Sequence, residues 1–340
     1  MDYRICFLRV EDHIFQIHFF HLLRDESSAF HDMLHIPSGG CSPQGFSRDE
    51  PITLTGDLLD ELRAFHALAY TSLDQLASPL KTADLPRMLN AGLFAHKYSL
   101  ISFRDFALRT IQQIGATFTL NSFPANIMHD LLRLTWLCGP DRYNAQGTDE
   151  FIIRSFVRSG WISDLNANPS AKNLAQKIAS AAEFDYRPLI GDIYHVYLLQ
   201  ITNKKGPKHT PGPIPFPDSE MFDLHRSRLL AGYWSLTQCW ARFAEAAPPL
   251  PSTNTCQRPS HHQTRCAEAW VSQWEWAATQ PEVMAIQSLD IIPKLFAFHA
   301  ALARASDTCS SSFVKTAVAE YICASKESLA DHFLGPLPLV

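Results

Sequence analysis

The hydrophobic pattern of this 340-residue chain changes near residue 118. Before that point, Arg4 to Val10 and Ile14 to His18 are rich in strand-forming residues and alternate loosely, and Ile52 to Thr55 supplies a third short strand. Segments with helical spacing separate and follow these strands. Beyond residue 118 the strand signal almost disappears. The pattern therefore predicts an α+β protein, with a mixed N-terminal domain over residues 1–118 and an all-helical region over residues 119–340.

Helices are expected where apolar residues recur three and four positions apart. In the N-terminal region, a helical segment from Phe19 breaks before Ser27 or Ser28, either of which can cap a short second helix. Asp57 can cap the next helix, and Ser102 with Asp105 resembles a capping box. The helices expected beyond residue 118 cover residues 127–138, 149–161, 171–183, 190–201, 219–246, 265–278, 289–305 and 312–333. Two proline-rich segments, 206–217 and 247–259, are expected to be long loops within this region.

Composition narrows the classes of function. The apolar share of 46% and the charged share of 19% indicate a folded globular protein. The net charge of −5 does not favour sequence-independent binding of nucleic acid. The chain has no unbroken apolar run of about 18 residues, and its eight cysteines are scattered. We therefore expect a cytoplasmic or nuclear protein, with no direct nucleic-acid, membrane or small-molecule partner.

Several segments of the N-terminal region resemble the BTB/POZ family, as does the order of the expected elements. In the family's hairpin, a phenylalanine and a histidine three residues later begin the first helix, and Val10 to His18 has this pattern. The other similar segments are Ser27 to Met33, Pro51 to Thr55, Leu62 to Thr71 and Leu93 to Tyr98. The resemblance implies a short three-stranded sheet flanked by helices.

A second resemblance covers the C-terminal region. Leu229 to Leu236, followed by Cys256, Cys266, Trp270 and Trp274, is similar to the corresponding part of BTB proteins that are expanded in mushroom-forming fungi. The resemblance implies a non-catalytic adaptor or scaffold whose partner is another protein, either a second copy of itself or a cullin. A substrate adaptor for a cullin-type ubiquitin ligase is one form of this function, and a transcription-associated scaffold is the alternative.

The sequence departs from the family at two places. Many BTB domains carry an aspartate at the head of the first strand and a basic residue after the histidine, where this chain has Ile5 and Phe19. This departure counts against the charged pocket with which some members recruit corepressors. The sequence also contains no nucleophile elbow, P-loop or dinucleotide fingerprint, so no motif gives a reason to propose an enzyme.

One cluster has the residue types of a metal site. Cys256, His261 and Cys266 are spaced five residues apart, and thiolate and imidazole are the ligands that a structural Zn²⁺ prefers. A fourth ligand could come from Cys309, Cys323 or His299. The functional hypothesis is a zinc-stabilised helical binding module. The simpler interpretation, two ordinary cysteines with solvated histidines, is favoured over the zinc site.

Three further groups have a structural and a functional interpretation. His31 and His35 lack the glutamate order of a zincin motif and are expected to be surface histidines. The basic run of Lys204, Lys205 and Lys208 is expected to be a solvated loop. The tryptophans of the C-terminal region form either a helical core or the anchors of a partner groove, and these are Trp234, Trp240, Trp270, Trp274 and Trp276.

Overall fold

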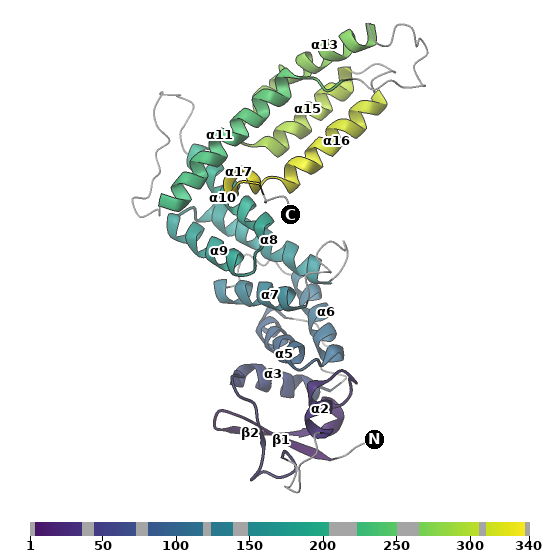
Figure 1. Cartoon of the computed structure of the whole chain (residues 1–340), viewed down its shortest axis with the longest axis vertical. Coiled ribbons are helices and arrows are strands. Elements are labelled where there is room, and N and C mark those ends of the chain that lie inside the picture. The colour runs from purple at the N-terminus through teal and green to yellow at the C-terminus, as the bar shows by residue number, and fades with distance from the viewer. Residues whose placement is uncertain are drawn as a thin grey trace. The chain divides into compact units, whose positions relative to one another are not determined.

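The computed structural model describes residues 4–35, 44–72, 81–117, 124–138, 149–203, 223–249, 265–305 and 311–336 (Figure 1). The chain divides into two compact units, unit 1 with Met1–Trp161 and unit 2 with Ile162–Val340. Unit 1 contains a small three-stranded sheet, and helices dominate the rest of the described chain, which confirms the α+β class. Unit 1 extends past the expected boundary at residue 118, because helix α7 (Ala125–Leu137) packs against α5 (Leu85–Lys97).

The sheet has the strand order β2-β1-β3. β1 (Ile5–Val10) pairs with β2 (His13–His18) as an antiparallel hairpin and with β3 (Ile52–Thr53) as a parallel neighbour. The predicted hairpin is therefore confirmed. The third strand is shorter than expected, since after Leu54 the chain turns through Gly56, which adopts a φ of +76°. Side chains at alternate positions of β1 are buried, as expected for a sheet with one covered face.

Helices α1 (Phe19–Leu22) and α3 (Leu59–Ala69) contact β2, and the helices of unit 1 share an aromatic core. The rings of Phe65 and Phe94 stack with centroids 4.8 Å apart, and those of Phe30 and Tyr98 with centroids 4.6 Å apart. All four side chains are buried. Besides α5 and α7, the helical elements of this unit are α1 (Phe19–Leu22), α2 (Ala29–His35), α3 (Leu59–Ala69), the 3₁₀ turn η1 (Thr82–Asp84), α6 (Ile101–Thr117) and the first part of α8 (Asp149–Ala167).

Asp57 does not cap α3, contrary to the prediction. The N-cap position is Leu58, which makes no side-chain cap, and the Asp57 side chain is fully buried. Tyr98 donates its hydroxyl proton to Asp57 Oδ2 at 2.7 Å, and Lys97 Nζ lies 2.8 Å from the same oxygen. The local pattern assigned the Asp57 carboxylate to the N-terminus of α3, but the carboxylate instead bonds to Lys97 on α5 and to Tyr98 at the C-cap of α5. Burial, together with Asp57, raises the pKa of Tyr98.

The predicted capping box at Ser102 is also wrong. α6 begins at Ile101, and both the backbone N–H and the Oγ of Ser102 donate to the carboxylate of Asp25, over 3.0 and 2.5 Å. Asp25 lies in the segment between α1 and α2, so a carboxylate distant in sequence satisfies the first turn of α6. The predicted cap at Ser28 is confirmed, since its Oγ accepts from the backbone N–H of Phe30 at 3.3 Å.

Helices are the only regular secondary structure among the described residues of unit 2. The bounds of most of its helices lie close to the expected bounds, because the sequence has a strong helical periodicity. The segment expected as one helix over 312–333 forms two helices. The elements after α8 are α9 (Ala171–Glu183), α10 (Arg187–Asn203), α11 (Asp223–Glu245), α13 (Ala267–Ala278), α14 (Pro281–Met284), α15 (Ile291–Ala305), α16 (Ser311–Glu327) and α17 (Asp331–Leu334).

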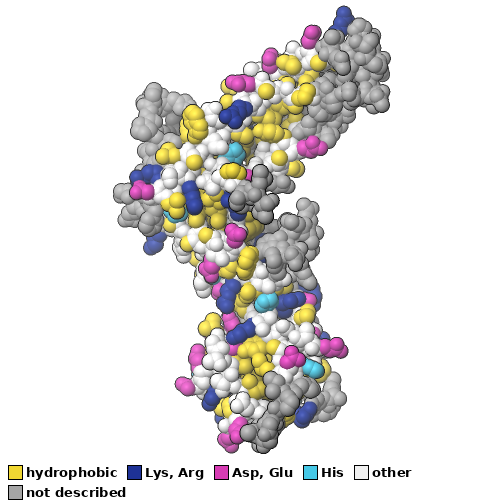
Figure 2. Space-filling view, in the orientation of Figure 1, with side chains coloured by type: hydrophobic (Ala, Val, Ile, Leu, Met, Phe, Trp, Pro, Cys, Tyr) yellow, Lys and Arg dark blue, Asp and Glu magenta, His cyan; other side chains and the backbone are white. Residues whose placement is uncertain are grey.

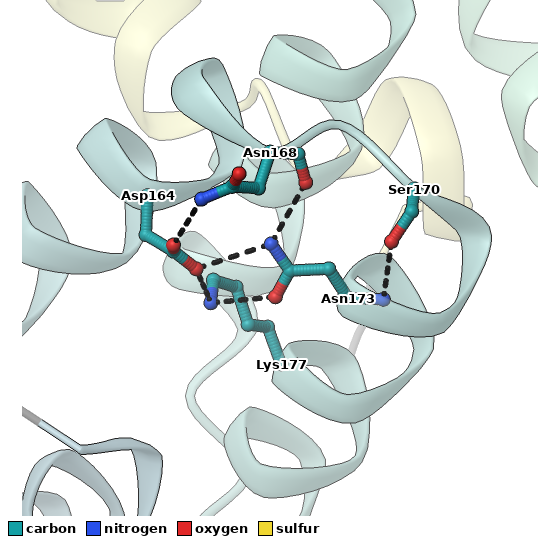
Figure 3. A network of polar contacts seen from close by, with 5 residues as sticks. All are labelled: Asp164, Asn168, Ser170, Asn173 and Lys177. Carbon is teal, nitrogen blue, oxygen red and sulfur yellow. Dashed lines mark hydrogen bonds and ion pairs between the residues drawn. The ribbon is translucent and has the colours of Figure 1, made fainter.

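Polar side chains fix the joint between α8 and α9 (Figure 3). Asp164 on α8 accepts hydrogen bonds from Lys177 Nζ at 2.6 Å, from Asn173 Nδ2 at 3.1 Å and from Asn168 Nδ2 at 3.0 Å. Ser170 caps α9 by accepting from the Asn173 backbone N–H at 3.2 Å. Burial raises the pKa of Asp164, but the hydrogen bonds and charge of its partners outweigh this effect and hold the pKa below its ordinary value.

Two glycines allow the short helix α17 and the residue before it to approach their neighbours closely. A Cβ at Gly191 on α10 would lie 2.6 Å from the Cα of Ala330, and a Cβ at Gly232 on α11 would overlap the ring of Phe333. That ring stacks on Tyr194 of α10 with centroids 5.6 Å apart. Small residues are therefore required on α10 and α11 where this last segment packs. Within the described residues, no helix is both long and apolar enough to cross a membrane.

Candidate protein-docking site

The structure describes only part of the predicted zinc cluster. Cys256 and His261 lie outside the described residues, as does Cys309, and Cys266 is half-buried at the start of α13. Among the described residues there is no group of three or more His, Cys, Asp and Glu side chains arranged to hold a metal ion. The zinc site therefore stays a prediction. The basic run at Lys204, Lys205 and Lys208 also lies outside the described residues, and so does the side chain of His35.

Two further residues were candidates for the fourth zinc ligand. Cys323 is exposed on α16. His299 is half-buried on α15, and its Nε2 is buried without a hydrogen-bond partner among the described residues. Neither observation by itself shows that the residue binds a metal ion. His31 lies on α2, where it is half-buried.

The sequence left two interpretations of the five tryptophans, a helical core or the anchors of a partner groove, and the structure divides them between a buried and an exposed group. Trp240, Trp270 and Trp274 are buried and form the predicted aromatic core. The indole N–H groups of Trp270 and Trp274 donate to backbone oxygens at 2.7 and 3.0 Å, so their burial leaves no unsatisfied donor. In contrast, Trp234 and Trp276 are 66% and 43% exposed. Figure 2 shows hydrophobic side chains at the surface of unit 2 over α11 and α15.

Unit 1 contains an open pocket of about 520 Å³ where α1, the end of α3 and the start of α6 meet. Phe20 and Ile101 on its rim are each 39% exposed, a high value for such large apolar side chains. Its apolar lining comes from three separate parts of the sequence: Phe20, Leu68, Ala69, Ile101, Phe103 and Phe106. The polar groups around it are His21, Arg24, Thr71, Ser102, Asp105 and Arg109.

Local sequence explains why Phe20 points outward. α1 is a single turn that directly follows β2, and its Phe19 and Leu22 side chains are buried. Adjacent residues on a helix face different directions, so the burial of Phe19 turns Phe20 towards solvent. The bonds from Ser102 to Asp25 then hold the segment after α1 against the start of α6, where Ile101 lies. The pocket is thus built between anchored elements.

The charges around the pocket are unbalanced. Asp105 accepts from Arg104 at 2.7 and 2.9 Å, so its negative charge is compensated. Arg24 and Arg109 are exposed, and neither forms an ion pair within the ranges that the structure describes. Two guanidinium groups therefore remain available beside an apolar floor. Such a surface is complementary to an amphipathic segment that carries acidic residues.

His21 lines the pocket, and its ring contacts a cluster of histidines and a tyrosine that lies beside the pocket. The Tyr70 hydroxyl accepts from the His18 backbone N–H at 2.8 Å and lies 2.6 Å from His18 Nδ1, and the His21 ring meets Tyr70 edge-on at 4.9 Å. Burial lowers the pKa of His21, and the nearby His18, Arg24 and His66 lower it further. The lowered pKa favours the neutral form of His21, so the positive charge of the pocket comes mainly from its arginines.

Sequence reasoning did not identify this pocket. Its one local signal is the pair Phe19-Phe20 in a one-turn helix, because both rings cannot be buried on the same side. Comparison with protein-family models, with curated proteins and with solved structures finds no match to this chain.

Proposed function

We propose that this chain is a non-catalytic protein–protein interaction protein, a BTB-type adaptor or scaffold, and that the pocket between α1, α3 and α6 receives a segment of the partner. The observation that carries this proposal is an apolar floor with an exposed rim, Phe20 and Ile101, beside two arginines that have no ion-pair partner within the described ranges. Large apolar side chains that remain exposed around a hollow are typical of docking surfaces.

The expected energetics fit a transient interaction. Full burial of one large apolar side chain contributes about 1.5–3 kcal/mol, and Phe20 and Ile101 are already partly buried. Their further burial would contribute roughly 1 kcal/mol each. Charge pairing at Arg24 and Arg109 would mainly speed association and fix the orientation of the partner. A partner bound through this pocket alone would therefore dissociate readily.

Support for the BTB-type form comes from topology. The sheet joins an antiparallel hairpin to a parallel third strand, and the helical pair α5 and α6 follows the sheet and α3. This arrangement agrees with the layout that the sequence resemblance implies. The proposed partner is a cullin of a ubiquitin ligase, which places the protein in the cytoplasm or the nucleus.

The test is affinity purification of tagged full-length protein from its native cells, followed by mass spectrometry. The variant combines Phe20→Asp with Ile101→Asp. The matched control is Leu58→Asp, because Leu58 is 57% exposed in the same unit, lies outside the pocket lining and occupies an N-cap position that favours aspartate.

We expect a cullin and its ring-finger partner to co-purify with the wild type and the control and to be lost with the double variant. Recovery of chromatin proteins in their place would favour the transcription-associated scaffold. Equal recovery with the double variant would show that the pocket is not the docking site.

A further inference from the structure

A second open pocket, of about 390 Å³, lies on α11 in unit 2. One face of α11 supplies most of its lining, with side chains at the three- and four-residue spacing of a helix, and α16 and α17 supply the rest. The α11 residues are Trp234, Ser235, Gln238, Cys239 and Arg242, and the other two are Tyr321 and His332.

Hydrogen bonds within the pocket occupy its deeper polar groups. Ser235 Oγ lies 2.8 Å from His332 Nδ1, and Cys239 Sγ lies 3.3 Å from the Tyr321 hydroxyl. These two bonds connect α11 to α17 and to α16. They fix the floor of the pocket, so the shape of the pocket does not depend on a bound molecule.

The outer groups of the pocket remain available for a ligand. Trp234 is 66% exposed, and within the described part of the chain neither Arg242 nor Gln238 has a hydrogen-bond or ion-pair partner. Leu230, one turn before Trp234 on the same helix, is also 46% exposed and extends the apolar surface. The described lining contains a guanidinium and no carboxylate, so its charge is complementary to an acidic ligand.

The spacing of these groups selects the kind of ligand. Trp234 and Arg242 are eight residues apart on one helix, which corresponds to about 12 Å along its axis. An extended peptide covers this distance in about four residues, at roughly 3.3 Å per residue. The volume of 390 Å³ suits one or two side chains of such a peptide.

We propose that this pocket is a second binding site of the chain, for a short acidic segment of a partner protein. An apolar side chain of the segment packs on the Trp234 indole, and a carboxylate about four residues away pairs with the Arg242 guanidinium. The site is separate from the pocket of unit 1 and does not depend on the function proposed for that pocket. It would allow the chain to hold one partner through each unit.

The experiment selects peptides from a phage-displayed library of random dodecapeptides on immobilised full-length protein. A selected peptide is then labelled with fluorescein, and its affinity is measured by fluorescence polarisation, beside a version with each Asp or Glu changed to the amide. The variants are Trp234→Ala and Arg242→Gln. The matched control is Trp276→Ala, because Trp276 is also exposed in unit 2 but does not line the pocket.

We expect the selected peptides to carry Asp or Glu about four positions from a bulky apolar residue. Each pocket variant should weaken binding about tenfold or more, and the control should stay within about twofold of the wild type. In the Arg242→Gln protein, the acidic and amide peptides should bind equally. Selected peptides without acidic preference, or unchanged binding to Arg242→Gln, would overturn the proposal. The double variant of the unit 1 pocket, Phe20→Asp with Ile101→Asp, is measured beside them, and loss of peptide binding in this variant but not in Trp234→Ala would also overturn the proposal and would leave the unit 1 pocket supported.

Discussion

Replacement of Gly191 by alanine should destabilise unit 2, because α10 has no room for a methyl group at this position. The added Cβ would lie 2.6 Å from Ala330 Cα and 2.8 Å from both its N and its Cβ. Two of these atoms are backbone, which cannot rotate away as a side chain can. Overpacking of this kind costs about 1–3 kcal/mol, and alanine recovers up to about 1 kcal/mol through its better helix propensity. Because two of the three contacts are with backbone, the cost should lie near the upper end of this range, which leaves a net loss of about 2 kcal/mol in the free energy of unfolding.

A urea titration followed by tryptophan fluorescence measures this loss. Five of the seven tryptophans belong to unit 2, so the signal reports mainly on this unit. The midpoint should fall while the slope with urea stays constant. In an Ala330→Gly background the same substitution should cost less, because one of the three crowded atoms is then missing. An unchanged or raised midpoint for Gly191→Ala would refute the close approach of α10 to the residue before α17.

The other predictions concern a buried carboxylate, a pH dependence and a metal. Tyr98→Phe should lower the free energy of unfolding by about 1.5–3 kcal/mol, because Asp57 loses its only hydroxyl donor among the described residues, and denaturation curves without a shift would contradict this. The pKa of Asp164 is lower in the folded state than its ordinary value, so its bonds stabilise unit 2 at neutral pH and this contribution is lost as the pH falls through the folded pKa. Asp164→Asn should therefore be less stable than the wild type at pH 7 and lose less stability on acidification in urea titrations, whereas parallel losses would count against the role of Lys177 as its partner. Elemental analysis of the purified chain tests the metal site: the favoured interpretation as ordinary cysteines predicts a zinc-free wild type, whereas one zinc ion that Cys256→Ser removes would support the zinc-stabilised module.

The fold class and most of the elements follow from local patterns. The hairpin and the long helices are specified by periodicity over a few residues, and the predicted bounds of α9, Ala171–Glu183, agree with the structure. The errors at Asp57 and Ser102 have a different origin. Both residues have the local context of a helix cap, but their partners lie 41 and 77 residues away in sequence. A local sequence pattern contains no information on which distant group will form a hydrogen bond with a given side chain.

The candidate pockets were harder to predict, because each combines residues from separate segments. The tryptophans illustrate the reason. Trp234 and Trp240 lie on the same helix six residues apart, which places them about 120° apart around its axis. The two side chains therefore face different directions, and one is buried while the other is exposed. Helical geometry predicts that they differ, but the choice of the buried face depends on how α13 and α15 pack.

The packing of α17 has a consequence for synthesis of the chain. Arg187, at the start of α10, binds Asp331 and the carbonyl of Gly335, which follow it by 144 and 148 residues. At a translation rate of about 5–20 residues per second, α10 is made roughly 7–30 s before these partners. During that interval the surface of α10 that later covers α17 remains open to other contacts. Unit 2 can therefore complete its fold only late in translation, whereas the Asp25–Ser102 contact of unit 1 needs only 77 residues of further chain.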